Sequence, residues 1–344
     1  MSSIRRCVGV RSILLILAIF ASVDSNAAAE LQYPLSIAVA KSGTIYLADR
    51  DLPGVWKLEG GVLSVFFEGS KKFRTPLNAV RCVAVDREGK IWAGDSSTRD
   101  IYRLDDRGQA TGLTQKQRSA LRAIKTPSTI ESVAPKPNEQ KGAANKTSDE
   151  SNNKSEPAPT APPAKNTAAA PKAQFVFGEI GIPMDMAFDK SGAIFVSDLE
   201  IHRIVKVAAD DGKVQEFVQI PAPRGLCFDT RDNLWVISGR RLVKVSPKGE
   251  KTTIVDDGVF EFPHTVAVAP DQSAYVCDGY AKAIWKIPAG GKPEKFVSGE
   301  PLVNPVGMRL VDDKLFVVDP RAKAVFQITF DKRITPVTLK ASRS

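Results

Sequence analysis

The sequence is poor in the residues and motifs on which many enzyme families depend. Its 344 residues include only two histidines and four cysteines, with no C-x-x-C pair and no Cys/His spacing for zinc. Two histidines are too few for a three-histidine zinc site. A G-x-S-x-G nucleophile elbow, a G-x-G-x-x-G turn and a Walker sequence are also missing. The linear motifs of zinc enzymes, serine hydrolases and nucleotide-binding folds are therefore absent.

Long apolar runs are scarce as well, and the one that occurs lies near the N-terminus. Three arginines precede the apolar run 13–21, and Ala27–Ala29 supplies a small-x-small cleavage site. This order predicts a cleaved secretory signal peptide over residues 1–29. The run is short for a bilayer span, so an uncleaved anchor is the alternative. We expect a periplasmic or secreted protein without a membrane span.

Aromatic residues make up only 7% of the chain, and one long segment has none. Residues 114–172 contain eight prolines and much Lys, Asn, Ser, Glu and Ala. This composition buries too little apolar area to offset its ordering entropy, so we expect a disordered insertion. The segment carries ten basic and five acidic residues, a large share of the net charge of +9. The charge is therefore poor support for nucleic-acid binding, and we expect none.

Outside the insertion, the sequence repeats one pattern of short β-rich runs. The clearest copy extends from Pro183 to Val207, where the turn residues 189–192 separate runs of strand length. A fourth run follows another glycine turn, which makes the unit a four-stranded antiparallel meander. Copies recur at intervals of about 40 residues. The six copies begin at Pro34, Val80, Pro183, Pro223, Pro263 and Pro305.

Two columns of the repeat argue against chance. The second residue of the second strand is aromatic in every copy, and we interpret it as a wedge between neighbouring sheets. These residues are Tyr46, Trp92, Phe195, Trp235, Tyr275 and Phe316. Three positions later stands a column of carboxylates with one serine: Asp49, Asp95, Asp198, Ser238, Asp278 and Asp319. We interpret these carboxylates as caps for backbone N–H groups, with a functional acidic ring as the alternative.

Six such units predict an all-β, six-bladed β-propeller of four-stranded antiparallel blades, which protects its sheet edges by radial repetition. The expected order is signal peptide 1–29, blades 1 and 2 at 30–113, insertion 114–172, the remaining propeller at 173–339 and a tail at 340–344. We expect Phe175–Phe177 to form the outer strand of blade 2, which places the insertion in a bottom-face hairpin. Ring closure is expected to rest on face packing between blades 6 and 1. A short closing strand at residues 31–33 is left open.

The cysteines fit this fold. Removal of the signal peptide leaves Cys82, Cys227 and Cys277, all inside predicted strands. An exported protein can form disulfides. We nevertheless interpret these three thiols as small buried hydrophobes.

The repeat has a recognisable relative. The sequence Asp198–Val207 reads D-x3-H-R-I-x-K-V, and with the preceding G-x-I-F-V-S-D it resembles the NHL repeat. The wider relatives are six-bladed propellers of the gluconolactonase and senescence-marker-protein type. The resemblance covers residues 34–339 apart from the insertion. It implies the fold strongly and an activity weakly, because propellers carry many unrelated functions.

In the gluconolactonase-like relatives, the resemblance implies a divalent cation held by an Asn or Asp just before the Gly of P-x-G and by a Glu of the first blade. The matching positions here carry Arg224 and Val306, and no Glu stands at the mouth in blade 1. A hard cation needs several oxygen ligands. We therefore expect no metal and no cofactor, with a divalent cation in the central channel as the alternative.

The mouth of the channel on the top face is the expected site, because propeller enzymes usually bind small molecules and metals there. Two adjacent columns of the first strands line it. One reads Leu35, Arg81, Met184, Arg224, His264, Val306, and the other Ser36, Cys82, Asp185, Gly225, Thr265, Gly307. The candidate ligand-binding residues are Arg81, Asp185, Arg224 and His264, with no catalytic residue assigned.

Arginine forks recognise carboxylate or phosphate, so these residues suggest an anion-binding mouth. The sequence favours a plainer interpretation, in which Arg81 and Arg224 pair with Asp185 and the carboxylate column while the histidine packs. His202 is expected to be structural. We favour a monomeric, non-catalytic module that binds a protein or a small anionic ligand through its Arg-rich top face. The alternative is an envelope lactone hydrolase or lyase of the gluconolactonase or streptogramin-lyase type, with a rearranged site that uses His264 and Asp185.

Overall fold

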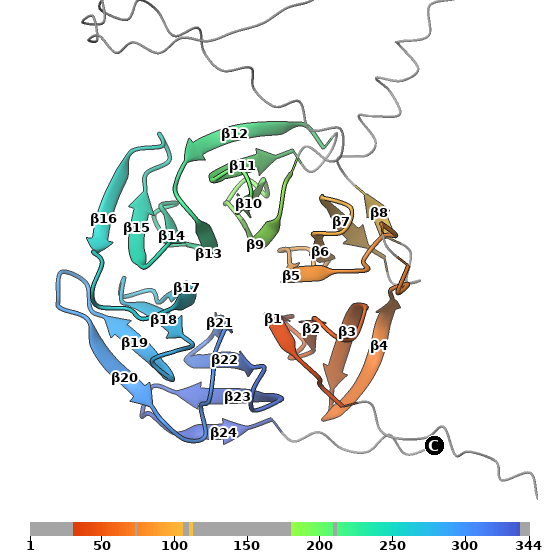
Figure 1. Cartoon of the computed structure of the whole chain (residues 1–344). Coiled ribbons are helices and arrows are strands. Elements are labelled where there is room, and N and C mark those ends of the chain that lie inside the picture. Colours follow the sequence, from red (N-terminus) through yellow and green to blue (C-terminus); the bar gives the residue numbers. More distant parts are fainter. Residues whose placement is uncertain (1–29, 73, 106–109, 113–179, 209–211, 338–344) are drawn as a thin grey trace, which may run out of the picture.

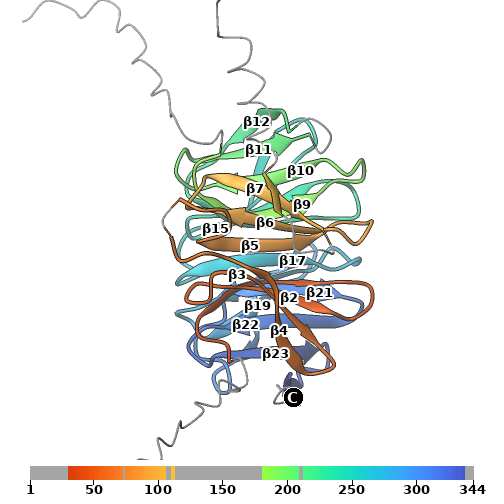
Figure 2. The same cartoon turned by 90° about the vertical axis from the view of Figure 1, so that its right-hand side faces the viewer.

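The computed structural model describes residues 30–72, 74–105, 110–112, 180–208 and 212–337. In this part of the chain all regular structure is β, and the strands form six four-stranded antiparallel sheets. The sheets surround a central axis as blades (Figure 1), and Figure 2 shows the ring from its edge. The predicted six-bladed propeller is confirmed. The described residues include no helix with the length and hydropathy that crossing a bilayer requires.

Each blade is one meander whose strands follow in sequence order. Blade 1 contains β1 (Pro34–Val39), β2 (Ile45–Asp49), β3 (Gly54–Glu59) and β4 (Val62–Glu68). Blade 2 contains β5 (Val80–Val85), β6 (Ile91–Asp95), β7 (Asp100–Leu104) and β8 (Ala110–Gly112). Blade 3 contains β9 (Pro183–Phe188), β10 (Ile194–Asp198), β11 (Arg203–Val207) and β12 (Val214–Gln219).

The other three blades have the same order. Blade 4 contains β13 (Pro223–Phe228), β14 (Leu234–Ser238), β15 (Arg241–Val245) and β16 (Lys251–Val255). Blade 5 contains β17 (Pro263–Val268), β18 (Ala274–Asp278), β19 (Ala283–Ile287) and β20 (Glu294–Ser298). Blade 6 contains β21 (Gly307–Val311), β22 (Lys314–Asp319), β23 (Ala324–Thr329) and β24 (Ile334–Pro336). The first strand of each blade lies nearest the axis (Figure 1).

The aromatic column packs between neighbouring blades, as predicted. The described core divides into six clusters of buried side chains, each drawn from two adjacent blades. Trp92 of blade 2 contacts Phe188 of blade 3 with 6.0 Å between ring centroids. Phe195 contacts Phe228 of blade 4 at 5.0 Å. The wedges therefore join each blade to the next by apolar burial.

The carboxylate column is structural, as predicted. All five carboxylates are buried, at most 2% exposed. Each accepts backbone N–H groups of the loop that leads into the first strand of its own blade, as Asp95 does from Leu77 and Ala79 at 2.9 and 3.0 Å. Ser238 takes the other role and donates its hydroxyl to the carbonyl of Pro221 at 2.7 Å. Because the carboxylates already accept these hydrogen bonds, the structure favours the structural role over a functional acidic ring.

Blade 2 takes its outer strand from an unexpected segment. β8 pairs with β7, so in the described part of the chain the fourth strand of this sheet lies before the insertion, whereas the prediction assigns it to Phe175–Phe177. Those three residues lie outside the described part of the chain. β8 escaped prediction because it has three residues, ends in glycine and lacks a β-type pattern. In a four-stranded meander the fourth strand ends where the first begins. Gly112 therefore lies at the mouth end of the blade, not at the bottom face.

Blades 6 and 1 close the ring by face packing, as expected. β24 is the outer strand of blade 6, and β21 and β22 contact β1 directly. Leu31 is 1% exposed and packs with Val306 and Val318 in the cluster between the two blades. Residues 31–33 are not in a strand, so they contribute side-chain packing to the closure and no β pairing.

The three described cysteines are free thiols. Cys82 and Cys277 are fully buried, and burial raises the pKa of both thiols and of Cys227. A raised pKa keeps a thiol protonated and unreactive at neutral pH. These features agree with the predicted role as small hydrophobic side chains.

Candidate functional site

A repeated backbone irregularity lies at the mouth end of the first strands. In five blades the pairing between the first and second strands shifts register there. Such β-bulges redirect side chains and are common beside functional sites. Arg81 is the second residue of β5 and His264 is the second residue of β17, and each lies at such a shift. The local geometry of the repeat thus presents this column of residues to the channel.

A pocket of about 260 Å³ opens at this end of the channel. All four residues singled out from the sequence line it: Arg81, Asp185, Arg224 and His264. Every blade contributes at least one side chain to the wall. The ring therefore brings together residues that are far apart in the sequence.

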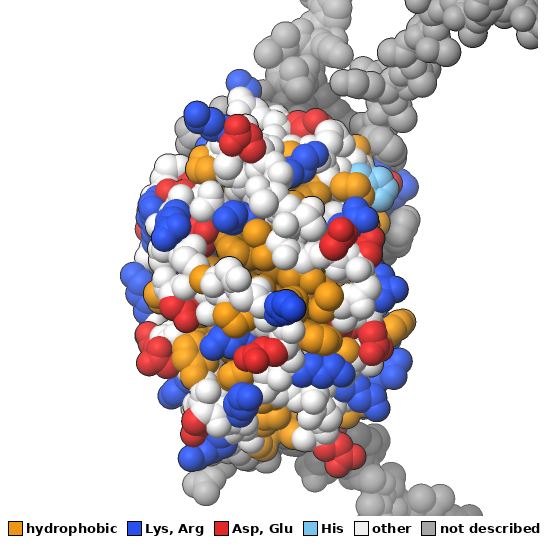
Figure 3. Space-filling model, turned by 90° about the vertical axis from the view of Figure 1, so that its left-hand side faces the viewer, with side chains coloured by type: hydrophobic (Ala, Val, Ile, Leu, Met, Phe, Trp, Pro, Cys, Tyr) orange, Lys and Arg blue, Asp and Glu red, His pale blue; other side chains and the backbone are white. Residues whose placement is uncertain are grey.

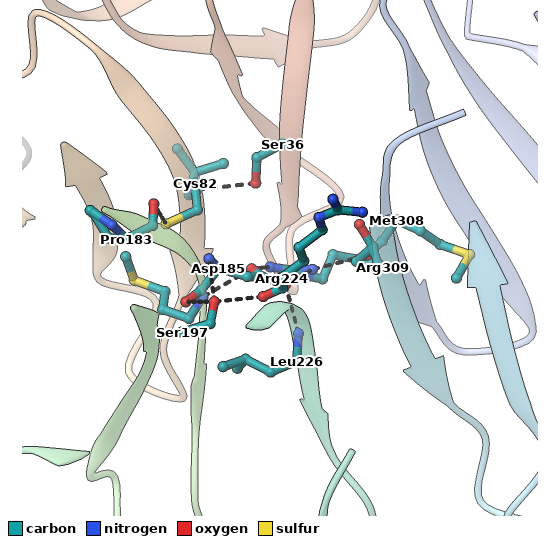
Figure 4. A network of polar contacts seen from close by, with 12 residues as sticks. Ser36, Cys82, Pro183, Asp185, Ser197, Arg224, Leu226, Met308 and Arg309 are labelled. Atoms are coloured by element: carbon teal, nitrogen blue, oxygen red, sulfur yellow. Dashed lines mark hydrogen bonds and ion pairs between the residues drawn. The ribbon is translucent and has the colours of Figure 1, made fainter. Parts of the chain in front are cut away.

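Asp185 forms an ion pair with an arginine that the sequence interpretation missed. Nη2 and Nη1 of Arg309 on β21 lie 2.5 and 3.4 Å from the two carboxylate oxygens of Asp185 on β9 (Figure 4). Burial opposes the charge of Arg309, but Asp185 outweighs burial and raises the pKa of the guanidinium. Asp185 also accepts the backbone N–H of Leu226 at 3.2 Å. The carboxylate is therefore committed to an ion pair across the channel between opposite blades (Figure 1).

A third column of the repeat accounts for Arg309. At its position in the first strand, the other five blades carry small side chains: Ala38, Ala84, Ala187, Cys227 and Ala267. Five small residues leave space at the axis for one long side chain. Arg309 lines both the mouth pocket and a second cavity of about 470 Å³, so the ion pair lies between the two. A comparison of this column would have identified Arg309 from the sequence.

Arg224 has no carboxylate partner among the described residues. Its Nη1 donates a hydrogen bond to the carbonyl oxygen of Pro263 at 3.1 Å, and its guanidinium carbon lies 4.0 Å from the ring centroid of Phe262. Burial lowers the pKa of Arg224. The guanidinium is therefore half-withdrawn from water and rests on an aromatic face, with hydrogen-bonding capacity to spare.

Arg81 likewise makes no ion pair within the described part of the chain, and its Nε lies 3.4 Å from the hydroxyl of Ser96. The expected pairing of Arg81 and Arg224 with Asp185 and the carboxylate column is wrong. Asp185 forms its ion pair with Arg309, and the carboxylates of the column accept hydrogen bonds from backbone N–H groups. Two of the mouth arginines are consequently left without a countercharge from the described residues.

His264 is neutral at physiological pH. Burial and the nearby charge of Arg224 lower the pKa of the imidazole to about 4, and Asp278 offsets only part of this. The surroundings are also crowded. A Cβ atom on Gly279 would stand 2.4 Å from Oδ1 of Asn304 and 3.3 Å from Nε2 of the histidine. The glycine therefore leaves the space that brings the imidazole and the amide to one side of the pocket.

An aromatic stack forms part of the pocket rim. Phe262 and Tyr280 lie with ring centroids 4.7 Å apart and 19° between their planes, and His264 meets Phe262 edge-on at 4.8 Å. Tyr280 is 61% exposed, which is high for so large a side chain. The sequence interpretation missed these aromatics and Asn304 in the same wall, whereas Arg321, which also lines it, belongs to the predicted Arg-rich top face. Phe262 and Asn304 share a sequence signal, because each directly precedes the proline that opens a blade.

His202 is structural, as expected. Its Nδ1 accepts the backbone N–H of Ala222 at 3.0 Å, and its φ of 57° places it in a left-handed turn. Equivalent loops of three other blades also turn through a left-handed residue: Arg99, Lys282 and Lys323. The histidine does not line the mouth pocket.

The pocket does not fit the divalent cation that the resemblance implies. Arg224 and Val306, at the positions of the relatives' ligands, both line it. Asp185 is the one carboxylate among its described wall residues, and Arg309 already pairs with it. The described residues include no group of three or more His, Cys, Asp or Glu side chains that could hold a metal. Guanidinium groups without a countercharge would also repel a cation, so no metal-dependent step is assigned here.

No protein-family model and no curated protein matches the chain. Solved structures do resemble it. Virginiamycin B lyase from Staphylococcus aureus is 14% identical over 90% of this chain and 86% of the lyase, with a TM-score of 0.57. A gluconolactonase from Xanthomonas campestris is 12% identical over 89% of this chain and 87% of its own, with a TM-score of 0.59. The fold is that of the lyase and lactonase propellers.

The same fold also occurs in a different setting. A chain from a nidogen/laminin complex is 13% identical over 81% of this chain and 87% of its own length, with a TM-score of 0.54. At such low identities the likeness shows the fold alone. The relation to the gluconolactonase and streptogramin-lyase propellers fits the resemblance seen in the sequence, and the more specific assignment to NHL repeats stays a prediction.

Proposed function

We propose that the mouth pocket binds a small anionic organic molecule. Arg224 carries this proposal, because its guanidinium is half-withdrawn from water and has no carboxylate partner among the described residues. A charge in such a position costs free energy unless an anion accompanies it. Arginine forks hold carboxylate or phosphate groups through two parallel hydrogen bonds. The aromatic rim at Phe262 and Tyr280 supplies apolar contact for the rest of the ligand.

We prefer catalysis on this molecule to passive binding, and the reaction class is that of a lactone hydrolase or lyase. The similarity in fold to a virginiamycin B lyase and a gluconolactonase supports this choice. A neutral imidazole at His264 has a lone pair with which to act as a general base. The arginines would stabilise negative charge that develops during the reaction. Asp185 has no part in this proposal, because Arg309 holds it.

The second candidate is the non-catalytic binding module. A pKa of about 4 makes His264 a weak base in the ligand-free protein, whereas efficient bases titrate near the working pH. The likeness to a chain of the nidogen/laminin complex also supports a binding role for this fold. Both candidates use the same anion-binding pocket. They differ in whether the bound molecule is converted.

Export belongs to the proposal as well. Residues 1–29 lie outside the described part of the chain, and their sequence carries the prediction of a cleaved signal peptide. A protein in the periplasm or outside the cell would meet its ligand there. N-terminal sequencing of the protein recovered from cell fractions would identify the mature terminus and the compartment.

A titration with matched probes tests the pocket. Benzoate and phenyl phosphate serve as anions, and benzamide and phenol as neutral counterparts, followed by calorimetry. We expect the anions alone to bind and Arg224→Gln to weaken them about tenfold or more, because a hydrogen bond to a charged group is lost. Arg241→Gln is the matched control, since Arg241 pairs with Asp256 and Asp257 and does not line the pocket. Unchanged affinity in Arg224→Gln would overturn the proposal.

Turnover separates the two candidates. Purified protein is incubated with lactones that carry a free carboxylate, such as glucaro-1,4-lactone, and, as comparisons, with neutral aldonolactones and a streptogramin B depsipeptide. Ring opening is followed by chromatography. We expect conversion that His264→Gln abolishes while anion binding persists. If anions bind at Arg224 and no lactone or depsipeptide is opened, the catalytic candidate fails and the binding module stands.

A further inference from the structure

Three arginines line the mouth pocket from alternate blades. Arg81 lies on β5 of blade 2, Arg224 on β13 of blade 4, and Arg321 in the loop after β22 of blade 6. Blades 2, 4 and 6 are spaced around the axis with one blade between each pair (Figure 1). The basic groups therefore face a bound molecule from three sides.

The wall of the pocket has an excess of positive charge. Its described residues include four arginines and one carboxylate, which leaves +3. The carboxylate of Asp185 neutralises the charge of Arg309, and His264 adds no charge at neutral pH. The remaining charge thus comes from the three arginines of alternate blades, and none of the three makes an ion pair within the described part of the chain.

Outside the pocket, most top-face arginines have an acidic partner. Four of the top-face arginines outside the pocket have acidic partners: Arg50 with Asp51, Arg99 with Glu200, Arg203 with Asp198, and Arg241 with Asp256 and Asp257. Arg240 instead donates a hydrogen bond to the carbonyl oxygen of Phe260 at 2.8 Å. On the side of the ring, Lys and Arg lie interspersed with Asp and Glu (Figure 3). On the top face, arginines without an acidic partner among the described residues are therefore concentrated in the pocket.

We infer that the ligand of this pocket is a compact polyanion with two or three negative charges. The inference rests on the proposed anion-binding function and narrows it. A cavity of about 260 Å³ is small for a ligand site, so the charges of its occupant must lie close together. Di- and tricarboxylates and small phosphorylated molecules share this chemistry, and their oxygens suit arginine forks.

Two series of anions at constant ionic strength test the inference on the full chain. The carboxylates are acetate, succinate and propane-1,2,3-tricarboxylate, and the phosphates are phosphate, pyrophosphate and triphosphate. We expect the affinity measured by calorimetry to rise about tenfold with each added charge within at least one series. The series that binds more tightly identifies the chemical source. An acetate affinity equal to that of the tricarboxylate, with phosphate equal to triphosphate, would overturn the inference.

Single variants assign the charges to the three sides. Arg81→Gln and Arg321→Gln are each expected to weaken the trianion about tenfold and to leave acetate nearly unchanged. Arg241→Gln, outside the pocket, serves as the control, and thermal melts verify that every variant is folded. If Arg224→Gln alone weakens binding and all anions bind alike, the inference fails while the proposed function stands. Binding of long polyphosphate without binding of triphosphate would also overturn it.

Discussion

The two sets of polar residues at the mouth end of the blades handle their charge in opposite ways. The carboxylate column recurs in five blades, and each member is saturated with hydrogen bonds from its own blade. The arginines of the mouth pocket are not a repeated feature. Only two of the six blades carry arginine in the column of Arg81 and Arg224, and three others carry Leu35, Met184 or Val306 there. Arg81 and Arg224 also lack countercharges among the described residues. A polar residue that repeats thus stabilises the fold, and one that departs from the repeat marks the site.

Removal of a column carboxylate should have the largest effect on stability. Asp95→Ala takes an acceptor from the backbone N–H groups of Leu77, Ala79 and Ser97 and from the hydroxyl of Thr98. With buried donors left unsatisfied, we expect the free energy of unfolding to fall by about 4 kcal/mol. Urea unfolding followed by tryptophan fluorescence measures this quantity.

The control for that prediction is the exposed carboxylate of Asp51, whose replacement by alanine should leave the free energy of unfolding nearly unchanged. Asp95→Asn keeps one acceptor oxygen and gives a folded intermediate case if the alanine variant does not fold. Equal, small losses in both alanine variants would contradict a structural role for the column. The claim that the repeated carboxylates stabilise the fold, unlike the mouth arginines, would then fail.

The ion pair across the channel is expected to have the next largest effect. Arg309→Met leaves the carboxylate of Asp185, which is 4% exposed, without its countercharge. We expect a loss of about 3 kcal/mol in the free energy of unfolding, because an unpaired buried charge remains. The double variant Asp185→Leu/Arg309→Met should recover most of the loss, which a double-mutant cycle measures. A double variant as unstable as the single one would show that lost packing, not charge, is the cause.

Much of the fold was predictable because its physical requirements repeat. Each blade needs an apolar wedge and a capped loop, so an aromatic such as Trp92 and a carboxylate such as Asp95 recur at fixed spacing. The outer strand β8 was not predictable in this way. Outer strands contact one neighbour only, so composition there is loosely constrained, and Ala110–Gly112 carries no β-type pattern.

The site was predictable only in part, for a related reason. Alignment of the blades brought Arg81, Arg224 and His264 to one end of the channel, and the structure confirms this meeting. It could not give the partner of Asp185, because contacts across the channel depend on which blades are opposite. Tyr280 lies in a loop, where the repeat imposes no residue type. The repeat therefore predicts which side chains lie at the mouth of the channel, whereas their ion-pair partners can be identified only from the closed ring.

The smallest of the three stability effects should appear in the pH dependence contributed by His264. In the unfolded chain its imidazole binds a proton near its ordinary pKa of 6.5, whereas in the folded protein burial and the charge of Arg224 lower the pKa to about 4. The unfolded state thus binds more protons between these values. The stability that His264 contributes is present above pH 6.5 and is lost as the pH falls to 4.

We expect this loss to be about 2 kcal/mol, since the imidazole keeps some contact with solvent. Urea unfolding of the wild type and of His264→Gln at pH values from 7 to 4 measures it as the change in the difference between the two curves. Carboxylates titrate equally in both proteins and cancel. A bound tricarboxylate should reduce the change, because it offsets the charge of Arg224 that helps to keep the imidazole neutral. If the stability curves of the two proteins ran parallel over this pH range, the mouth would not disfavour a further positive charge. The claim that the mouth arginines, unlike the carboxylate column, are uncompensated would then fail.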